Sequence, residues 1–356
     1  RHVFSHFGAG SFVNGTDTYL SGNFILNPIL FCRERDEMYR NFWFYPKVYI
    51  HESCKITTPF DMLVNQIVER SRGDQRHGSC GVGINETVVR YRNYGIGHTI
   101  TPKTIRSLDL KYLLSYQRDV YLSKRLKELG VSNISLNDLG VILSENIIDN
   151  WIAQVNEMMD YCQVVNDDIV HDYDGLVFEG AQGLLLDEMY EEFAPYLTTS
   201  RTGIPGVNRV LYSAGLHDCR NIEMCFVSRT YFTRHGAGFF PTECSAKDLF
   251  GEDKQDATNV WNEFQGSFRY GYFEEDRFRN VCGQEFKRAK RMYPYTKLSF
   301  AFTHADETDG MVLESFGHKE IKDVVSPLSP DCFYTSIGNT RQHIVEAPLK
   351  THSKSQ

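Results

Sequence analysis

The sequence predicts an α/β protein, built as a single large domain with a mostly parallel central sheet flanked by helices. Short apolar runs of strand length alternate along the chain with longer stretches of helical periodicity. Glycine-rich turns follow some of the apolar runs, as is typical of the carboxyl edge of a parallel sheet. No linker, low-complexity tract or internal repeat divides the 356 residues, so we expect one domain over residues 1–356.

The N-terminal half predicts two strands followed by helices. Residues 24–26 and 48–50 are apolar runs of strand length. Thr58, Pro59 and Asp61 supply an N-cap, a proline at the first helical position and an acid three residues after the cap, so a helix is expected from there to Gly73.

Further helices and strands follow in alternation. The periodicity predicts a long amphipathic helix over residues 107–129, capped by Ser107, and another helix opened by Ser135 with Asp138. The helical pattern continues over residues 151–165. Strands are then expected at residues 176–178, 222–227 and 298–303.

The composition excludes several classes of protein. The formal net charge of -8 argues against a nucleic-acid-binding or membrane-surface protein, whose phosphate-rich partners require a basic face. The nine cysteines stand singly, without the paired spacing of a zinc site, and indicate a reduced cytoplasmic protein. No apolar run reaches membrane-spanning length. Neither a nucleic-acid partner nor a membrane partner is expected.

Three glycine-rich turns carry the chemical signal. They occur at residues 77–83, around Gln182, and at residues 234–238. At the edge of a parallel sheet such turns present backbone N–H groups to phosphorylated ligands. The alternative, that the glycines merely permit tight turns, stays open for each turn taken alone.

Two of these segments resemble one known family. FEGAQG at residues 178–183, then TRHGAG at residues 233–238 with PTE at residues 241–243, resemble the adenylosuccinate synthetase family. The two signatures in this order are hard to obtain by chance. The resemblance extends over nearly the whole chain and implies a P-loop-related α/β fold.

The resemblance implies a purine monophosphate site. Gln182 would read the purine base near its reacting edge, with a structural turn amide as the alternative. Ser79 and Cys80, which stand where the family usually has two threonines, would hold the monophosphate, and a cysteine replaces a hydroxyl poorly. Thr198 resembles the threonine that contacts the phosphate, with a helix cap as the alternative. Arg234 would bind an anionic group.

Two further residues of this site depend on looser matches. His235 stands where the family has an apolar residue, and we expect it to face the sugar. Arg90 resembles an arginine that reaches across a homodimer to the phosphate, and Arg92 is the competing match.

The loop at residues 264–272 resembles the family loop that captures aspartate with arginines. A carboxylate favours a planar, bidentate guanidinium, and Arg269 is the arginine retained from that cluster. Gln265 precedes it in the same loop. Aspartate is the expected amine donor, and a different amino acid is the alternative.

The segment THAD at residues 303–306 resembles the family strand end that reads the guanine of GTP. Asp306 would accept hydrogen bonds from guanine, and Thr303 would lie beside it; Ser336 and Gly338 resemble a second segment near the base. A competing alignment places Ser299 at the aspartate position, and ATP would then be the expected donor.

The family's phosphate loop and its GGxNAGHT segment do not occur in residues 1–356. We expect the catalytic aspartate and histidine, with the phosphate loop, to lie upstream of Arg1. His6 does not match the family histidine. No metal ligands are visible in the chain, although the resemblance implies Mg²⁺.

The resemblance implies a ligase that joins L-aspartate to the 6-position of an IMP-like purine monophosphate. GTP would drive the reaction through a 6-phosphoryl intermediate, with ATP possible. A homodimer is implied. Two alternatives stay open, namely a variant that acts on dGMP or another 2-aminopurine nucleotide with ATP or GTP, and a non-catalytic nucleotide-binding homologue.

Overall fold

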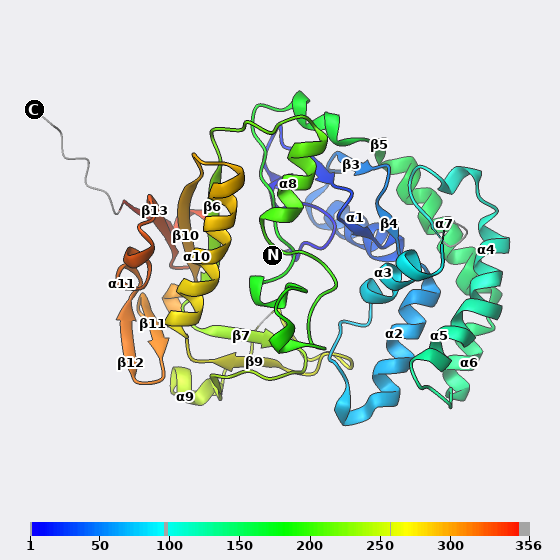
Figure 1. Cartoon of the computed structure of the whole chain (residues 1–356). Helices are drawn as coiled ribbons and strands as arrows, with labels where there is room; N and C mark the ends of the chain where they lie inside the picture. The colour runs from blue at the N-terminus through cyan, green and yellow to red at the C-terminus, as the bar shows by residue number, and fades with distance from the viewer. Residues whose placement is uncertain (1, 96–98, 257, 349–356) are drawn as a thin grey trace, which may run out of the picture.

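The structure is a computed structural model that describes residues 2–95, 99–256 and 258–348, and it confirms the α/β class. Parallel strands occur in three separate sheets in the described residues, two larger ones and a two-stranded one, rather than in the one central sheet that the sequence predicted. Figure 1 shows one of the larger sheets beside α10 and the other larger sheet among the helices at the opposite end of the molecule. Loops and α8 lie between them.

The N-terminal sheet is parallel, with strand order β1-β3-β5. Its strands are β1 (Thr18–Leu20), β3 (Val48–His51) and β5 (Gln163–Val165). The pair β2 (Ile25–Leu26) and β4 (Lys55–Ile56) is also parallel. The apolar runs predicted near residues 24–26 and 48–50 are therefore strands, and Val48 and Ile50 enter the core.

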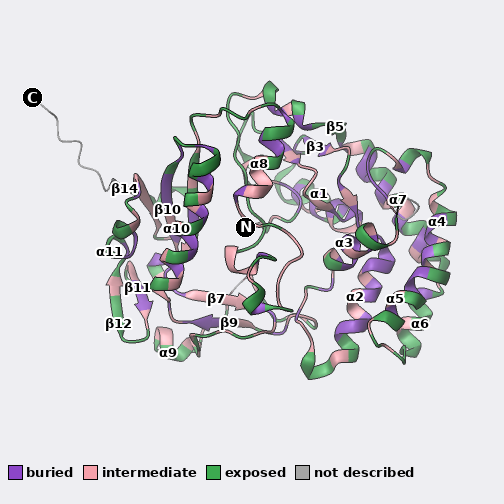
Figure 2. Cartoon of the chain, in the orientation of Figure 1, coloured by how far each residue is buried: buried purple, intermediate pink, exposed green. Residues whose placement is uncertain are grey.

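Helices surround this sheet and bury a common core. They are α1 (Pro28–Phe42), α2 (Pro59–Arg72), α3 (Ile84–Asn93), α4 (Leu110–Tyr116), α5 (Ser123–Glu128), α6 (Leu136–Ile142) and α7 (Glu145–Tyr161). The predicted capping box is present: the Asp61 N–H donates to Thr58 Oγ1 at 3.3 Å and the Thr58 N–H donates to Asp61 Oδ2 at 2.8 Å. Figure 2 shows the buried residues concentrated where these helices meet the sheet.

The second sheet has the order β14-β13-β10-β6. Its strands β6 (Glu223–Arg229), β10 (Lys297–Thr303) and β13 (Cys332–Ser336) are parallel, and β14 (Ile344–Pro348) pairs antiparallel with β13. Helices α10 (Glu275–Met292) and α11 (Ile321–Val325) accompany it. Phe300 and Phe302 of β10 lie two residues apart on one face of the strand, where both are fully buried and contact the Phe278 ring of α10.

Smaller elements complete the fold. An antiparallel sheet has the order β7-β9-β8, with β7 (Phe232–His235), β8 (Glu243–Cys244) and β9 (Phe268–Gly271). β11 (Met311–Glu314) and β12 (Gly317–Glu320) form a hairpin, and α8 (Ile204–Ser213) and α9 (Ala246–Phe250) are short helices. The 3₁₀ segments are η1 (Ala9–Phe12), η2 (Gly73–Gln75), η4 (Ile105–Ser107), η6 (Asp167–Asp172), η7 (Leu184–Leu186), η8 (Glu191–Phe193), η9 (Ala305–Glu307), η10 (Ser326–Leu328) and η11 (Arg341–His343).

The structure corrects three predicted elements. Residues 176–178 form no strand: Val177 is 89% exposed, and no described strand pairs with this run to supply the hydrogen bonds that a strand needs. The helix predicted over residues 107–129 is capped by Asp109 instead of Ser107 and changes to a π-helix at η5 (Gln117–Leu122). The helix expected to reach residue 165 ends at Tyr161, because the next residues pair with β3.

The helices in the part of the chain that the structure describes lack the combination of length and apolar character needed to span a membrane.

Candidate functional site

Two of the glycine turns singled out in the sequence contact each other directly. Gly78 has a φ of +71°, and a Cβ at this position would lie 2.3 Å from the backbone nitrogen of Ala237. Gly236 has a φ of +94°, and its Cβ would lie 2.5 Å from the carbonyl oxygen of Gly78. Side chains are excluded at both positions, so these glycines allow two distant segments to pack backbone against backbone.

A buried carboxylate from α2 holds the first turn. Glu69 accepts hydrogen bonds from the N–H groups of Gly78 at 2.7 Å, Ser79 at 3.3 Å and His77 at 3.3 Å. The anion that these N–H groups bind in this structure is therefore the Glu69 side chain. Sequence reasoning missed Glu69, although an acid beside the apolar stripe of the predicted helix was an available signal.

The Ser79 hydroxyl keeps its donor capacity. Asn65 Nδ2 donates to Ser79 Oγ at 2.7 Å, which leaves the Ser79 O–H to donate to a ligand. Cys80, the next residue, is exposed. The turn thus offers one hydroxyl and one thiol at its surface.

The loop that contains Gln265 lies against the same turn. A Cβ on Gly81 would lie 2.5 Å from the Phe264 ring, and Arg76 donates to the carbonyl of Glu263 at 3.0 Å. Asn262 Oδ1 organises the loop by accepting from the N–H groups of Phe264 and Gln265, at 2.8 and 3.2 Å. The predicted amino-acid loop and the predicted phosphate turn are therefore neighbours.

Arg234 connects the second turn to the segment before Thr198. Its Nε donates to the carbonyl of Ala237 at 2.9 Å and its Nη2 to the carbonyl of Tyr196 at 3.2 Å. Burial and the neighbouring Arg269 lower the pKa of Arg234. Since a guanidinium stays protonated in proteins, Arg234 brings a partly buried positive charge to this junction.

Arg269 clamps the second turn. Its Nη1 donates to the carbonyls of Gly236 and Gly238 at 3.0 and 2.9 Å, while Nε and Nη2 bind the carboxylate of Glu243. These hydrogen bonds hold the pKa of Glu243 below its usual value. In this arrangement Arg269 stabilises the second turn. A carboxylate of a ligand would compete with Glu243 for the Arg269 guanidinium.

His235 faces the loop at residues 262–266. Its Nε2 lies 3.3 Å from the Gly266 carbonyl and its ring packs edge-on against Phe268 at 5.7 Å. His235 therefore joins β7 to that loop.

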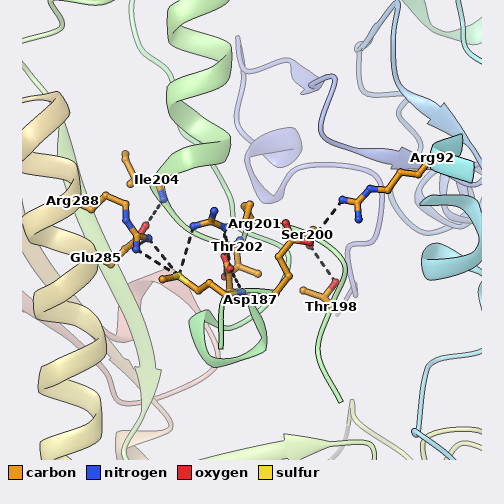
Figure 3. A network of polar contacts seen from close by, with 11 residues as sticks. Arg92, Asp187, Thr198, Ser200, Arg201, Thr202, Ile204, Glu285 and Arg288 are labelled. Carbon is orange, nitrogen blue, oxygen red and sulfur yellow. Dashed lines mark hydrogen bonds and ion pairs between the residues drawn. The ribbon is translucent and has the colours of Figure 1, made fainter. Parts of the chain in front are cut away.

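Gln182 and Thr198 lie on segments that run side by side. Gln182 is exposed, and a Cβ on Gly180 in its turn would lie 3.4 Å from the carbonyl of Thr202. Farther along, the Thr198 N–H donates to the Leu186 carbonyl at 2.8 Å. Figure 3 shows Thr198 beside Ser200, and their hydroxyl oxygens are 3.2 Å apart.

The expectation that Arg90 reaches a phosphate is wrong in this structure. Its side chain has no exposed area, and its guanidinium donates to Asp61 and to the Ile56 carbonyl. The competing Arg92 is exposed and lies 3.8 Å from Glu188, whose N–H donates to the Ser200 carbonyl (Figure 3). Helix periodicity explains the difference, because two residues along a helix place a side chain on a different face.

A second group of predicted residues lies at the carboxyl ends of β10 and β13. Thr303 ends β10, Asp306 is exposed in the following turn, and Ser336 ends the neighbouring parallel strand. Ser336 donates to the carbonyl of Gly338 at 2.9 Å. Ser299, the competing match for Asp306, is 1% exposed in the middle of β10, so it cannot face a ligand at this edge.

The two groups are linked through the backbone that leads into β7. Thr230, which precedes β7, donates to the His304 carbonyl at 3.4 Å, and the Tyr231 hydroxyl donates to Glu307 at 2.5 Å. The site therefore consists of a main group of turns and an adjoining strand edge.

Other features of the described residues do not enlarge this site. His6 is buried in the N-terminal core, where its Nε2 accepts from the Asn27 N–H, and burial lowers its pKa to about 4. No group of three or more His, Cys, Asp or Glu side chains in residues 2–95, 99–256 and 258–348 could hold a metal ion.

A comparison of the sequence with models of known protein families gives a match that includes these turns. The family model for adenylosuccinate synthetase matches residues 1–274. The chain belongs to this family. Relatives include the adenylosuccinate synthetases of Synechocystis sp., 27% identical over 236 residues, and of Pseudoalteromonas atlantica, 29% identical over 197 residues.

These alignments cover 64% and 54% of the chain and 49% and 42% of the two relatives, so the chain spans about half the length of the curated relatives it matches. Among solved structures, the cyanophage S-2L succinoaminodeoxyadenylate synthetase (PurZ), bound to dGMP and to dATP as an energy donor, has a TM-score of 0.56. It is 14% identical, and the alignment covers 98% of this chain and 81% of that one. The likeness shows that the fold is shared.

Proposed function

We propose that the protein is a purine nucleotide synthetase that joins L-aspartate to the 6-position of a purine monophosphate, with hydrolysis of a nucleoside triphosphate. The observation that supports this most is the meeting of four sequence-marked segments around one junction, within a chain of the adenylosuccinate synthetase family. These segments are residues 77–83, 195–200, 234–238 and 264–272.

The proposed monophosphate site uses side chains that remain able to bind a ligand. Ser79, Thr198 and Ser200 would donate hydroxyl hydrogen bonds to the phosphate, and Arg92 supplies an exposed positive charge nearby. Gln182, exposed beside the Thr198 segment, would read the base with its amide donor and acceptor. Arg234 would stabilise negative charge through its position between the turns.

The proposed amino-acid site is the loop with Gln265 together with Arg269. Arg269 already binds Glu243 through two nitrogens, so the geometry for carboxylate recognition is present. Aspartate binding would then require Arg269 to exchange or share this partner.

The proposed triphosphate site lies at the strand edge with Thr303, Asp306, Ser336 and Gly338. Asp306 is exposed and Ser299 is buried, which favours a guanine donor, since guanine offers an N1–H and an amine to a carboxylate. Mg²⁺ would be bound mainly by the phosphates, because the described residues offer no metal centre of their own, and no step of this proposal depends on it.

A second candidate function is supported by the solved PurZ structure, whose bound nucleotides are dGMP and dATP. In this alternative the chain acts on a 2-aminopurine nucleotide with an adenine nucleotide as donor. His235, which replaces an apolar residue of the family signature, and Ser79 with Cys80, which replace two threonines, are positions at which the monophosphate site departs from the family.

The test is a product assay on the full-length protein. IMP or dGMP is mixed with aspartate and with GTP, ATP or dATP, and the adduct and the nucleoside diphosphate are quantified by chromatography. We expect one monophosphate to give both products in equal amounts. Calorimetry that detects no binding of any purine monophosphate or triphosphate would falsify the proposal. Binding without turnover would support the non-catalytic homologue instead.

A cytoplasmic homodimer is proposed as the working form of the protein.

A further inference from the structure

Residues 198–204, here called the hydroxyl segment, are held by two buried carboxylates, those of Asp187 and Glu285. Asp187 is 3% exposed and accepts from the Thr202 N–H at 2.7 Å and from Arg201 Nε at 3.0 Å. Its Oδ1 also accepts from the Met189 N–H at 2.9 Å. Both carboxylate oxygens are therefore used, and Figure 3 shows Asp187 below Arg201 and Thr202.

Backbone hydrogen bonds on each side of Asp187 fix its register against the hydroxyl segment. The Thr198 N–H donates to the Leu186 carbonyl at 2.8 Å, and the Glu188 N–H donates to the Ser200 carbonyl at 3.3 Å. Asp187 thus lies between two fixed points. Loss of its carboxylate would remove the hydrogen bonds of residues 201–202, which directly follow Ser200, so that the two backbone hydrogen bonds alone would hold this part of the hydroxyl segment.

Glu285 of α10 fixes the other end of the segment. Its Oε1 accepts from the Ile204 N–H, the first residue of α8, at 2.6 Å, and its Oε2 accepts from Arg288 at 2.5 Å (Figure 3). A Cβ on Gly203 would lie 2.0 Å from Glu285 Oε1. Only glycine allows the carboxylate to come this close. Any side chain at position 203 would therefore displace the Glu285 carboxylate from the Ile204 N–H.

The charges of both carboxylates are balanced locally. Asp187 is paired with Arg201, and Glu285 is paired with Arg288. Buried carboxylates beside an anion-binding segment would otherwise repel the anion. Because each acid is paired with an arginine, the two acids hold the segment without adding net negative charge to it. Thr198 Oγ1 and Ser200 Oγ then lie 3.2 Å apart on the same segment.

We infer that Asp187 and Glu285 are positioning residues, which hold the hydroxyls of Thr198 and Ser200 in the arrangement that receives the anionic group of a purine monophosphate. This inference rests on the proposed function. Neither acid touches the reacting atoms in this scheme. They act through the hydroxyl segment, and their loss weakens monophosphate binding without a comparable effect on the triphosphate.

The first test compares Gly203→Ala with Gly206→Ala in the full-length protein. A Cβ on Gly206 would meet its nearest atom, the Arg201 carbonyl, at 3.7 Å, which is ordinary contact. Calorimetry with IMP and dGMP should show at least tenfold weaker binding for Gly203→Ala and less than twofold change for Gly206→Ala. Triphosphate affinity should change less than twofold in both.

The second test compares Asp187→Asn with Glu191→Gln, an exposed acid in the same region. Asparagine keeps the shape of aspartate and removes the charge. We expect at least tenfold weaker monophosphate binding and faster amide hydrogen exchange across residues 198–204 for Asp187→Asn, with the control unchanged. If Asp187→Asn does not fold, Gly203→Ala decides alone.

If the wild-type protein binds a monophosphate and the variants bind it equally well, the inference is wrong and the proposed function stands. Wild-type protein that binds neither monophosphate overturns the proposed function, and the inference with it. Equal weakening of monophosphate and triphosphate binding also overturns the inference, because a general loss of structure would act on both.

Discussion

The buried pair of Arg90 and Asp61 provides the sharpest prediction, because it separates a structural arginine from a ligand-binding one. Neither side chain has any exposed area, and Arg90 donates to Asp61 through Nε at 2.9 Å and Nη2 at 2.8 Å. Arg90→Met keeps much of the apolar volume but leaves a buried carboxylate without its cation. Breaking one partner of a buried pair costs about 3–5 kcal/mol, or roughly a hundredfold to several thousandfold in the folding equilibrium.

The assay is urea unfolding at 25 °C, together with calorimetric titration of the monophosphate into the folded variant. Arg90→Met should lose about 3–5 kcal/mol of stability, and Asp61→Asn combined with Arg90→Met should recover part of that loss, since no buried charge then remains unpaired. The folded Arg90→Met protein should bind the monophosphate as the wild type does.

Arg92→Met is the matched control on the same helix. Its side chain is exposed and lies 3.8 Å from Glu188, and an exposed pair of this kind contributes at most about 1 kcal/mol. We expect little change in stability and weaker monophosphate binding. An Arg90→Met protein that is as stable as the wild type but binds the monophosphate poorly would refute this reasoning.

Four further predictions follow from the site and the core. Glu69→Gln should lower stability by about 1–3 kcal/mol in urea unfolding and weaken monophosphate binding, because the amide accepts poorly from three N–H groups; unchanged values for both would contradict the role given to the carboxylate. Gly78→Ala should abolish monophosphate binding in calorimetry, whereas Gly215→Ala, with a nearly equal φ of +72° and open space around it, should only lower stability; similar binding by both variants would show that contact between the turns does not matter. Since the folded pKa of His6 (about 4) lies below its unfolded value, stability is complete above about pH 6.5 and falls as the pH drops toward 4; urea unfolding at pH 7.5 and 5 should show that His6→Gln reduces this loss, and an unchanged pH dependence would refute it. Asp306→Asn should weaken GTP binding at least tenfold with little effect on ATP, measured by competition, and equal effects on the two would rule out base recognition there.

The sequence by itself determined the class of fold, several of its elements and the segments of the site. Thr58 and Asp61 predicted a capped helix that the structure contains, because capping depends on residues close in sequence. The strand β10 was also predicted, since Leu298, Phe300 and Phe302 alternate with smaller or polar residues, which is a local pattern of strand period. The glycine turns at residues 77–83 and 234–238 could be marked because a backbone conformation with positive φ selects glycine locally.

Only the tertiary structure decided how those segments are used. Residues 176–178 have the composition of a strand but lack a partner among the described residues, and pairing is not a local property. The choice between Arg90 and Arg92, and between Ser299 and Asp306, depended on burial, which no short motif contains. Glu69, Asp187 and Glu285 were not singled out, because each acts on a segment that begins between 8 and 81 residues away in sequence. Long-range hydrogen bonds of this kind follow from packing, and therefore appear when the chain is folded.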